Sequence, residues 1–160
     1  MRRIIALGLF FCFLLLFAGC SGGTADSKKV LDEYIKNIQD GDYESAYSML
    51  TGFDQGNISK DLFVEWQSTA AKLSTIESYE VDKKVDKFKN YEYMGAKFKK
   101  AYGFRVLCKR KTLVQEAKTE GYDTEDFRIM VADDNGSLKV ALLLTKLEDT
   151  VKNYQRQLEE

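Results

Sequence analysis

Residues 34–50, YIKNIQDGDYESAYSML, predict a helix, its C-terminal end and the start of a second helix. We expect the first helix to begin at about Ser27, because apolar residues recur from there at helical spacing. They are Val30, Leu31, Tyr34, Ile35 and Ile38. Gly41 can adopt the left-handed conformation that often ends a helix, and Asp42 can serve as the N-cap of the next helix. The second helix has its own apolar residues: Tyr43, Ala46, Tyr47 and Leu50.

A third helix and several strands are predicted after this pair. Residues 51–57 read as a loop, and Ser59 is placed to cap a helix with the apolar stripe Leu62, Phe63, Trp66, Ala70 and Leu73. Beyond it the apolar period changes to two, which indicates strands. The alternating runs are residues 79–85, 104–108, 127–131 and 138–144, with 86–97 irregular and Gly103 a candidate bulge. Asn135-Gly136 between the last two runs predicts a tight hairpin.

The C-terminal residues 147–160 are predicted to form a helix with a narrow apolar stripe. The stripe consists of Leu147, Val151, Tyr154 and Leu158, spaced by four, three and four residues. A helix this short is unstable in isolation, so the stripe must pack on something. It packs back on the chain's own sheet, or it is a partner-facing surface for another protein or a second copy.

Three helices followed by four antiparallel strands indicate an α+β fold, with the helices on one face of a curved sheet and the C-terminal helix added. Residues 34–50, with a Gly-Asp-Tyr turn and a following Ala-Tyr, resemble the opening of extracytoplasmic domains with the nuclear transport factor 2-like cone fold. Residues 58–63 resemble the start of their third helix, and residues 131–140 their final hairpin. Leu138 stands where such domains often carry Trp. The resemblance implies a cone-fold domain similar to the one that precedes the transpeptidase in some penicillin-binding proteins.

The first twenty residues have the layout of an export signal. Two arginines precede an apolar run over residues 4–17, and Cys20 follows two small residues. This pattern resembles the bacterial lipoprotein signal, with Phe17 where Leu is usual. The resemblance implies cleavage after residue 19, diacylation of Cys20 and anchoring on the extracytoplasmic face of the cell membrane. An uncleaved anchor is the weaker alternative, because the run spans only about 21 Å as a helix, against about 30 Å of hydrocarbon.

We therefore expect four segments. They are a signal peptide (1–19), the lipidated Cys20 with a flexible tether (20–26), a cone-fold domain (27–146) and a C-terminal helix (147–160). Cys108 is then the one thiol left in the mature domain, so no intrachain disulfide forms. Its alternation with Phe104 and Val106 predicts a core thiol.

Charge is distributed unevenly along the chain. Residues 83–111 hold 11 Lys and Arg against 2 Asp and Glu, although the whole chain has a net charge of −1. Such a basic segment either lies on the solvated face of strands or meets an anionic surface such as lipid headgroups. Nucleic acid is not expected as a partner, because the protein is exported and not basic overall.

The inventory of reactive residues argues against catalysis. The chain has no His, so a Ser or Cys nucleophile would lack its usual base. Residues 133–136, DDNG, do not make a calcium loop, because Val131 and Leu142 occupy ligand positions. We predict no catalytic residue, metal or cofactor. The alternative is an isomerase or dehydratase that uses a buried Asp and Tyr, because the cone fold hosts such enzymes.

The remaining hypothesis is a non-catalytic binding or scaffolding module at the cell envelope. A cone fold leaves an apolar mouth between its helices and its sheet, which is the default ligand site. Tyr47, Phe63 and Trp66 are the candidate lining residues. The expected partners are the membrane, through the lipidated Cys20, and either a small apolar ligand or an envelope protein.

Overall fold

The computed structural model describes residues 23–112 and 122–159 of the 160-residue chain. Within them, helices α1 (Thr24–Asp40), α2 (Tyr43–Ser48), α3 (Gly52–Asn57) and α4 (Lys60–Leu73) come first. Strands β1 (Ser74–Tyr93), β2 (Ala96–Thr112), β3 (Tyr122–Asp134) and β4 (Ser137–Ala141) follow, and α5 (Glu148–Glu159) comes last. The strands form one antiparallel sheet in the order β1-β2-β3-β4. The predicted α+β class is confirmed.

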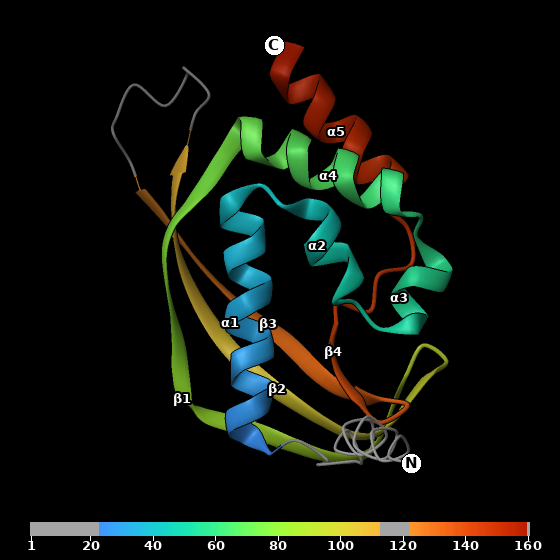
Figure 1. Cartoon of the computed structure of the whole chain (residues 1–160). Coiled ribbons are helices and arrows are strands. Elements are labelled where there is room, and N and C mark those ends of the chain that lie inside the picture. Colours follow the sequence, from blue (N-terminus) through green and yellow to red (C-terminus); the bar gives the residue numbers. More distant parts are fainter. Residues whose placement is uncertain (1–22, 113–121, 160) are drawn as a thin grey trace, which may run out of the picture.

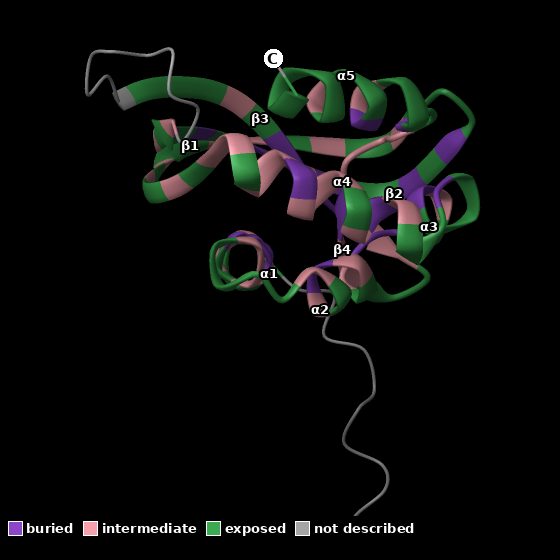
Figure 2. Ribbon diagram, turned by 90° about the horizontal axis from the view of Figure 1, so that it is seen from above, coloured by how far each residue is buried: buried purple, intermediate pink, exposed green. Residues whose placement is uncertain are grey.

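The sheet curves around α1 (Figure 1). Helix α4 crosses above α1, and α5 packs along α4. The main core lies between the concave face of the sheet and the helices. Side chains with no more than 1% exposure come from both layers: Leu31, Phe63, Phe104, Val106, Val131 and Val140. Seen from above, the buried residues lie where sheet and helices face each other, whereas α5 is mostly exposed (Figure 2).

The predicted helix ends at Gly41 and Asp42 are confirmed. Gly41 adopts the left-handed conformation, with φ of 75°, and the Asp42 carboxylate accepts a hydrogen bond from the Ser45 amide at 3.1 Å. The first helix starts earlier than predicted, at Thr24, because the Asp26 carboxylate accepts from the Gly23 amide and caps that end. The last residues of the predicted tether, 24–26, therefore belong to α1.

The prediction of a loop at residues 51–57 is wrong, because this stretch forms α3. Thr51 is its N-cap: the hydroxyl oxygen accepts from the Asp54 amide at 3.3 Å and donates to the Asp54 carboxylate at 2.6 Å. This pair of hydrogen bonds stabilises a helix of only six residues. Its sequence has no apolar periodicity that would predict it. Ser59 caps α4 as predicted, accepting from the Leu62 amide.

The strands of the β1–β2 hairpin are longer and more regular than predicted. Strand β1 begins at Ser74, directly after α4, and runs to Tyr93, so residues 86–97 are not irregular as a whole. The predicted bulge at Gly103 is wrong: this residue pairs in register with Asp86 and Met130. A Cβ here would lie 3.4 Å from the Phe88 ring, so glycine leaves room for that ring.

The second hairpin confirms one prediction and corrects another. Asn135 and Gly136 both have positive φ, 54° and 88°, as a two-residue β3–β4 turn requires. Strand β4 ends at Ala141, so Leu142 and Leu144 are not strand residues as the alternation predicted. Their amides are bound instead by a carboxylate of α3, described below.

Candidate functional site

A partly open cavity of about 220 Å³, which we call the main cavity, lies between the helices and the concave face of the sheet. Helices α1, α4 and α5, the first three strands and the segment after β4 all contribute to its wall. The wall is mostly apolar: Ile35, Ile38, Ala70, Ile76, Phe127, Ile129 and Leu142. Its polar members are Tyr34, Trp66, Gln67, Arg110, Arg128 and Tyr154. A concave, largely apolar site with a few polar groups is the usual form of a small-ligand site.

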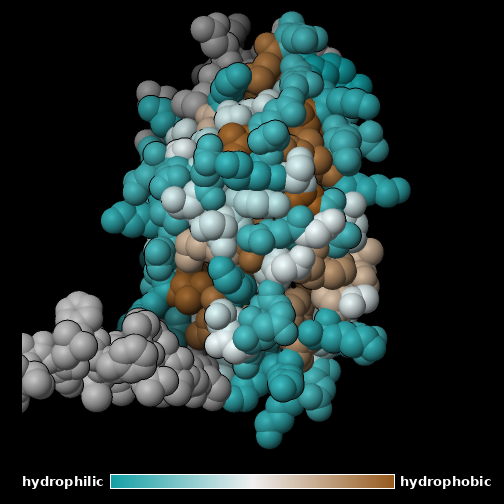
Figure 3. Space-filling model, turned by 45° about the vertical axis from the view of Figure 1, so that its right-hand side comes forward, coloured by the Kyte–Doolittle hydropathy of each residue, from teal (hydrophilic) through white to brown (hydrophobic). Residues whose placement is uncertain are grey.

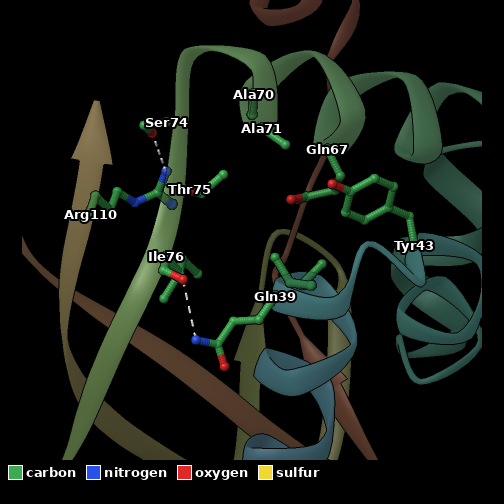
Figure 4. A pocket seen from close by; sticks show the side chains of 10 residues that line it. Gln39, Tyr43, Gln67, Ala70, Ala71, Ser74, Thr75, Ile76 and Arg110 are labelled. Carbon is green, nitrogen blue, oxygen red and sulfur yellow. Dashed lines mark hydrogen bonds between the residues drawn. The ribbon is translucent and has the colours of Figure 1, made fainter. Parts of the chain in front are cut away.

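A smaller space of about 60 Å³, which we call the side pocket, adjoins the main cavity. The two share part of their lining: Ile38, Gln67, Ala70, Ile76 and Arg110. The side pocket lies between the C-terminal ends of α1 and α4 and the start of β1 (Figure 4). The Gln39 amide donates to the Ile76 carbonyl at 3.3 Å at its lower edge. The side pocket is more polar than the main cavity, since Gln39, Tyr43, Ser74 and Thr75 join its wall.

The polar groups of the main cavity include hydrogen-bond donors without an acceptor. The Trp66 indole Nε1 is buried and has no hydrogen-bond partner among the described residues. Burial, and the nearby Asp54 carboxylate, raise the pKa of the Tyr34 hydroxyl far above its ordinary value, so it stays protonated. A buried, unpaired N–H group costs free energy, and an acceptor from a ligand would recover it.

Arg110 is the cation at the boundary of the two spaces. Its Nη1 donates to the Ser74 hydroxyl at 3.0 Å (Figure 4). Its Nε lies 2.8 Å from the Glu125 carboxylate, but the N–H is not aligned with that oxygen and makes no hydrogen bond. The Arg110 side chain is 25% exposed, whereas Glu125 is 54% exposed. The guanidinium therefore keeps donors available near the cavity.

Of the three predicted lining residues, Trp66 alone lines the main cavity. Phe63 is fully buried in the core, with its ring 5.7 Å from Tyr47 and 5.8 Å from Trp66. The Tyr47 hydroxyl donates to the Ile58 carbonyl at 2.9 Å, so it ties α2 to the segment before α4. Phe63 thus packs against Trp66, Tyr47 packs against Phe63, and neither Phe63 nor Tyr47 lines the main cavity.

Helix α5 packs mainly on α4. Leu147 and Val151 are 4% and 3% exposed, so they are core residues and cannot face a partner. Tyr154 lines the main cavity, and Leu158, at 40% exposure, is the one exposed member of the predicted partner-facing stripe. Figure 3 shows the side of the molecule that lies to the right in Figure 1, where apolar side chains surface in separate groups among hydrophilic ones. Most residues of the stripe therefore pack within the molecule.

Among the described residues, Asp54 is the one buried acid, with 0% exposure. Its carboxylate accepts hydrogen bonds from the Leu144 amide at 2.8 Å, the Leu142 amide at 3.2 Å and the Thr51 hydroxyl. Leu143 between the two amides has a positive φ of 58°, a conformation that costs free energy for a non-glycine residue. Asp54 therefore holds the chain between β4 and α5 in place, and it does not line either cavity.

Cys108 lies in the core with 0% exposure, as predicted. Burial raises the pKa of its thiol, although Arg110 opposes that rise. We expect no labelling by a thiol reagent in the folded domain near neutral pH and full labelling after denaturation, read by mass spectrometry. Cys108→Ala should cost on the order of 1 kcal/mol of unfolding free energy. Fast labelling of the folded domain would contradict this.

The basic segment 83–111 forms most of the β1–β2 hairpin. Lys89 and Lys100 lie directly opposite each other, both are exposed, and neither forms an ion pair with a described residue. Like charges in such a cross-strand pair are destabilising unless an anion lies nearby. At the turn, Tyr93 and Met94 are 48% and 59% exposed. The hairpin therefore presents cations and apolar groups together.

Tyr34 and Arg110 are the site residues that sequence analysis missed. Arg110 could have been found, because it continues the alternation of Phe104, Val106 and Cys108 and so places a charge on the apolar face of β2. Asp54 had no such signal. In the described part of the chain, no three His, Cys, Asp or Glu residues lie together as a metal site.

The predicted signal peptide and Cys20 lie outside the described residues. Within those residues, none of the helices has the length and apolar character to cross a membrane.

Comparisons with known proteins identify no family for this chain. No family model matches the sequence, and no curated protein matches it. Among solved structures, the chain is similar to a crystal structure from Campylobacter jejuni described as a "Putative NTF2-like transpeptidase". The two are 13% identical with a TM-score of 0.42, and the alignment covers 72% of this chain and 96% of the other. At that identity and TM-score the likeness says nothing about function.

Proposed function

We propose that this chain is a lipid-anchored, extracytoplasmic module that binds a small apolar ligand without transforming it. The observation that carries the proposal is the main cavity, with its apolar wall and the unpaired indole N–H of Trp66. The sequence supports the anchor, because Cys20 stands four residues before Thr24, the first residue of α1. A tether that short keeps the cone fold close to the membrane surface.

The alternative, an isomerase or dehydratase, needs a carboxylate that reaches the ligand. Asp54 and Tyr34 are close enough to interact electrostatically, so a buried Asp and Tyr do occur together. The Asp54 oxygens are, however, taken by two backbone amides and the Thr51 hydroxyl. Among the described residues, neither cavity has an Asp or Glu in its wall. These contacts support binding over acid–base chemistry.

The binding proposal can be tested with 1-octanol as a neutral apolar probe. Trp66 is the one tryptophan of the chain and lines the main cavity, so its fluorescence reports on occupancy. We expect saturable binding to residues 21–160, which contain the whole described core and whose folding is checked by cooperative thermal unfolding. Ala70→Leu should fill the cavity and abolish binding, whereas Ala70→Ser, of nearly native size, should retain it. Equal binding by both variants would refute the cavity as the site.

The exposed lysines of the β1–β2 hairpin predict a weak attraction of the domain to anionic membranes. Residues 21–160 should co-sediment with anionic vesicles at low salt and dissociate near physiological ionic strength, because each Lys contributes about 1 kcal/mol within a Debye length of about 8 Å. Replacing Lys89 and Lys100 with Gln should weaken binding about tenfold or more. The control replaces Lys28 and Lys29, which are paired with acids of α1. Binding that survives high salt would contradict an electrostatic contact.

A further inference from the structure

We propose that the ligand of this cavity is an amphipathic monoanion, with its apolar body in the main cavity and its carboxylate or similar head against Arg110. This inference deepens the proposed function and rests on it. It comes from the division of the site into an apolar chamber and a more polar side pocket, with Arg110 in the wall of both.

The size and wall of the main cavity set the body of the ligand. An apolar cavity of about 150 Å³ accommodates benzene. At about 220 Å³, the main cavity admits a body somewhat larger, such as one ring with a short side chain or a medium-length alkyl chain. Ile35, Ile129 and Phe127 come from opposite layers of the fold, so the body would be enclosed between helix and sheet.

The polar groups set the sign of the head. Arg110 and Arg128 are the charged residues among those that line the two spaces in the described chain. Arg128 is 57% exposed and is held by Asp86 at 3.0 Å, so water and that acid already satisfy it. Arg110 is more buried; it also pairs with an acid, Glu125 at 2.8 Å, but its Nε makes no hydrogen bond to that carboxylate. A partly buried cation with free donors favours an anion.

Neutral donors in the wall of the main cavity point to the same chemistry. The Trp66 indole can only donate, and the protonated Tyr34 hydroxyl also has a hydrogen to give. The Gln67 side-chain amide, shared by both spaces, adds another donor. A ligand with acceptor oxygens complements such donors, whereas an ammonium group has only donors and would face Arg110 with like charge.

Three probes with the same alkyl chain test this inference: octanoate, 1-octanol and octylammonium, each titrated into residues 21–160 while Trp66 fluorescence is recorded. We expect octanoate to bind at least about tenfold more tightly than octanol, and octylammonium to bind most weakly of the three. Arg110→Gln should reduce octanoate to the affinity of octanol and leave octanol unchanged. Arg105→Gln is the matched control, because Arg105 lies on the same strand, is 55% exposed and pairs with Asp126 outside the cavity.

The outcomes separate this inference from the function on which it rests. Octanol binding that Ala70→Leu abolishes, together with no preference for octanoate, would overturn the anionic head and keep the cavity as a ligand site. A preference for octanoate that persists in Arg110→Gln would overturn the role of Arg110. Saturable binding of none of the three probes would overturn both proposals. If Arg110→Gln unfolds, Arg110→Lys serves instead: it keeps the charge and should keep the preference for octanoate over octylammonium.

Discussion

Replacing Asp54 with alanine is expected to lower the free energy of unfolding by about 3–5 kcal/mol. The substitution leaves the Leu142 and Leu144 amides and the Thr51 hydroxyl without their acceptor in a buried site, and each such loss costs about 1–3 kcal/mol. The melting temperature should fall by about 10–15 °C for a domain of this size. Thermal and denaturant unfolding measure the change. Because Leu142 lines the main cavity, binding of the octyl probes should weaken as well.

Two further variants sharpen this test. Asp61→Ala removes an exposed acid from the first turn of α4 and should change stability by no more than about 0.5 kcal/mol. Asp54→Asn keeps one acceptor and should fall between Asp61→Ala and Asp54→Ala. A cost for Asp54→Ala no greater than that of the exposed control would show that the carboxylate does not hold the segment between β4 and α5.

The ionisation of Asp54 adds a pH dependence with a definite sign. Burial raises the pKa of this carboxyl above its ordinary value of 3.8, and the hydrogen bonds it accepts oppose part of that rise. The folded chain therefore binds the proton more tightly than the unfolded chain. As the pH rises from about 3.8 through the folded-state pKa, this group's contribution to the unfolding free energy should decline, and above that range it should be level. Asp54→Asn should lack this decline.

Replacing Cys20 with serine is expected to abolish anchoring. A lipoprotein signal requires the thiol for diacylation, so the precursor should keep its first nineteen residues and stay free of lipid. Metabolic labelling with palmitate, the mass of the N-terminal peptide and partitioning in detergent extracts measure the three consequences. Cys12→Ser is the matched control: it lies in the predicted signal peptide, and its product should be processed and anchored as usual. Normal processing of Cys20→Ser would refute the lipoprotein proposal.

Much of the fold could be predicted because its signals are local. Gly41 and Asp42 end one helix and begin the next through the conformation and hydrogen bond of the residues themselves. Asn135 and Gly136 turn the last hairpin for the same reason. Cys108 alternates with core residues on β2, and burial follows from which face of the sheet the helices cover. For the two turns a few neighbouring residues carry the whole cause, and for Cys108 the local alternation predicts which face of β2 it shares with the core residues.

Other features could not be predicted because their causes lie far apart in the sequence. The alternation of apolar and polar residues continues past Ala141. Strand β4 nevertheless ends there, because the amides of Leu142 and Leu144 donate to the Asp54 carboxylate, 88 and 90 residues earlier in the chain. The Thr51–Asp54 pair that caps α3 is local, but the Asp54 carboxylate is also bound by the distant amides of Leu142 and Leu144, which no pattern in residues 51–57 indicates. Trp66 and Phe63 share one apolar stripe, yet one lines the cavity and the other fills the core.

The sequence by itself determined that helices precede the strands, that Cys108 is buried and that the β1–β2 hairpin is basic, because periodicity, capping and charge act over a few residues. The tertiary structure alone decided that α5 packs on α4, that Leu147 and Val151 belong to the core, and that Trp66, Tyr34 and Arg110 meet around one cavity. A cavity is the space left where side chains from several distant segments fail to fill their common interior, and no single segment encodes it.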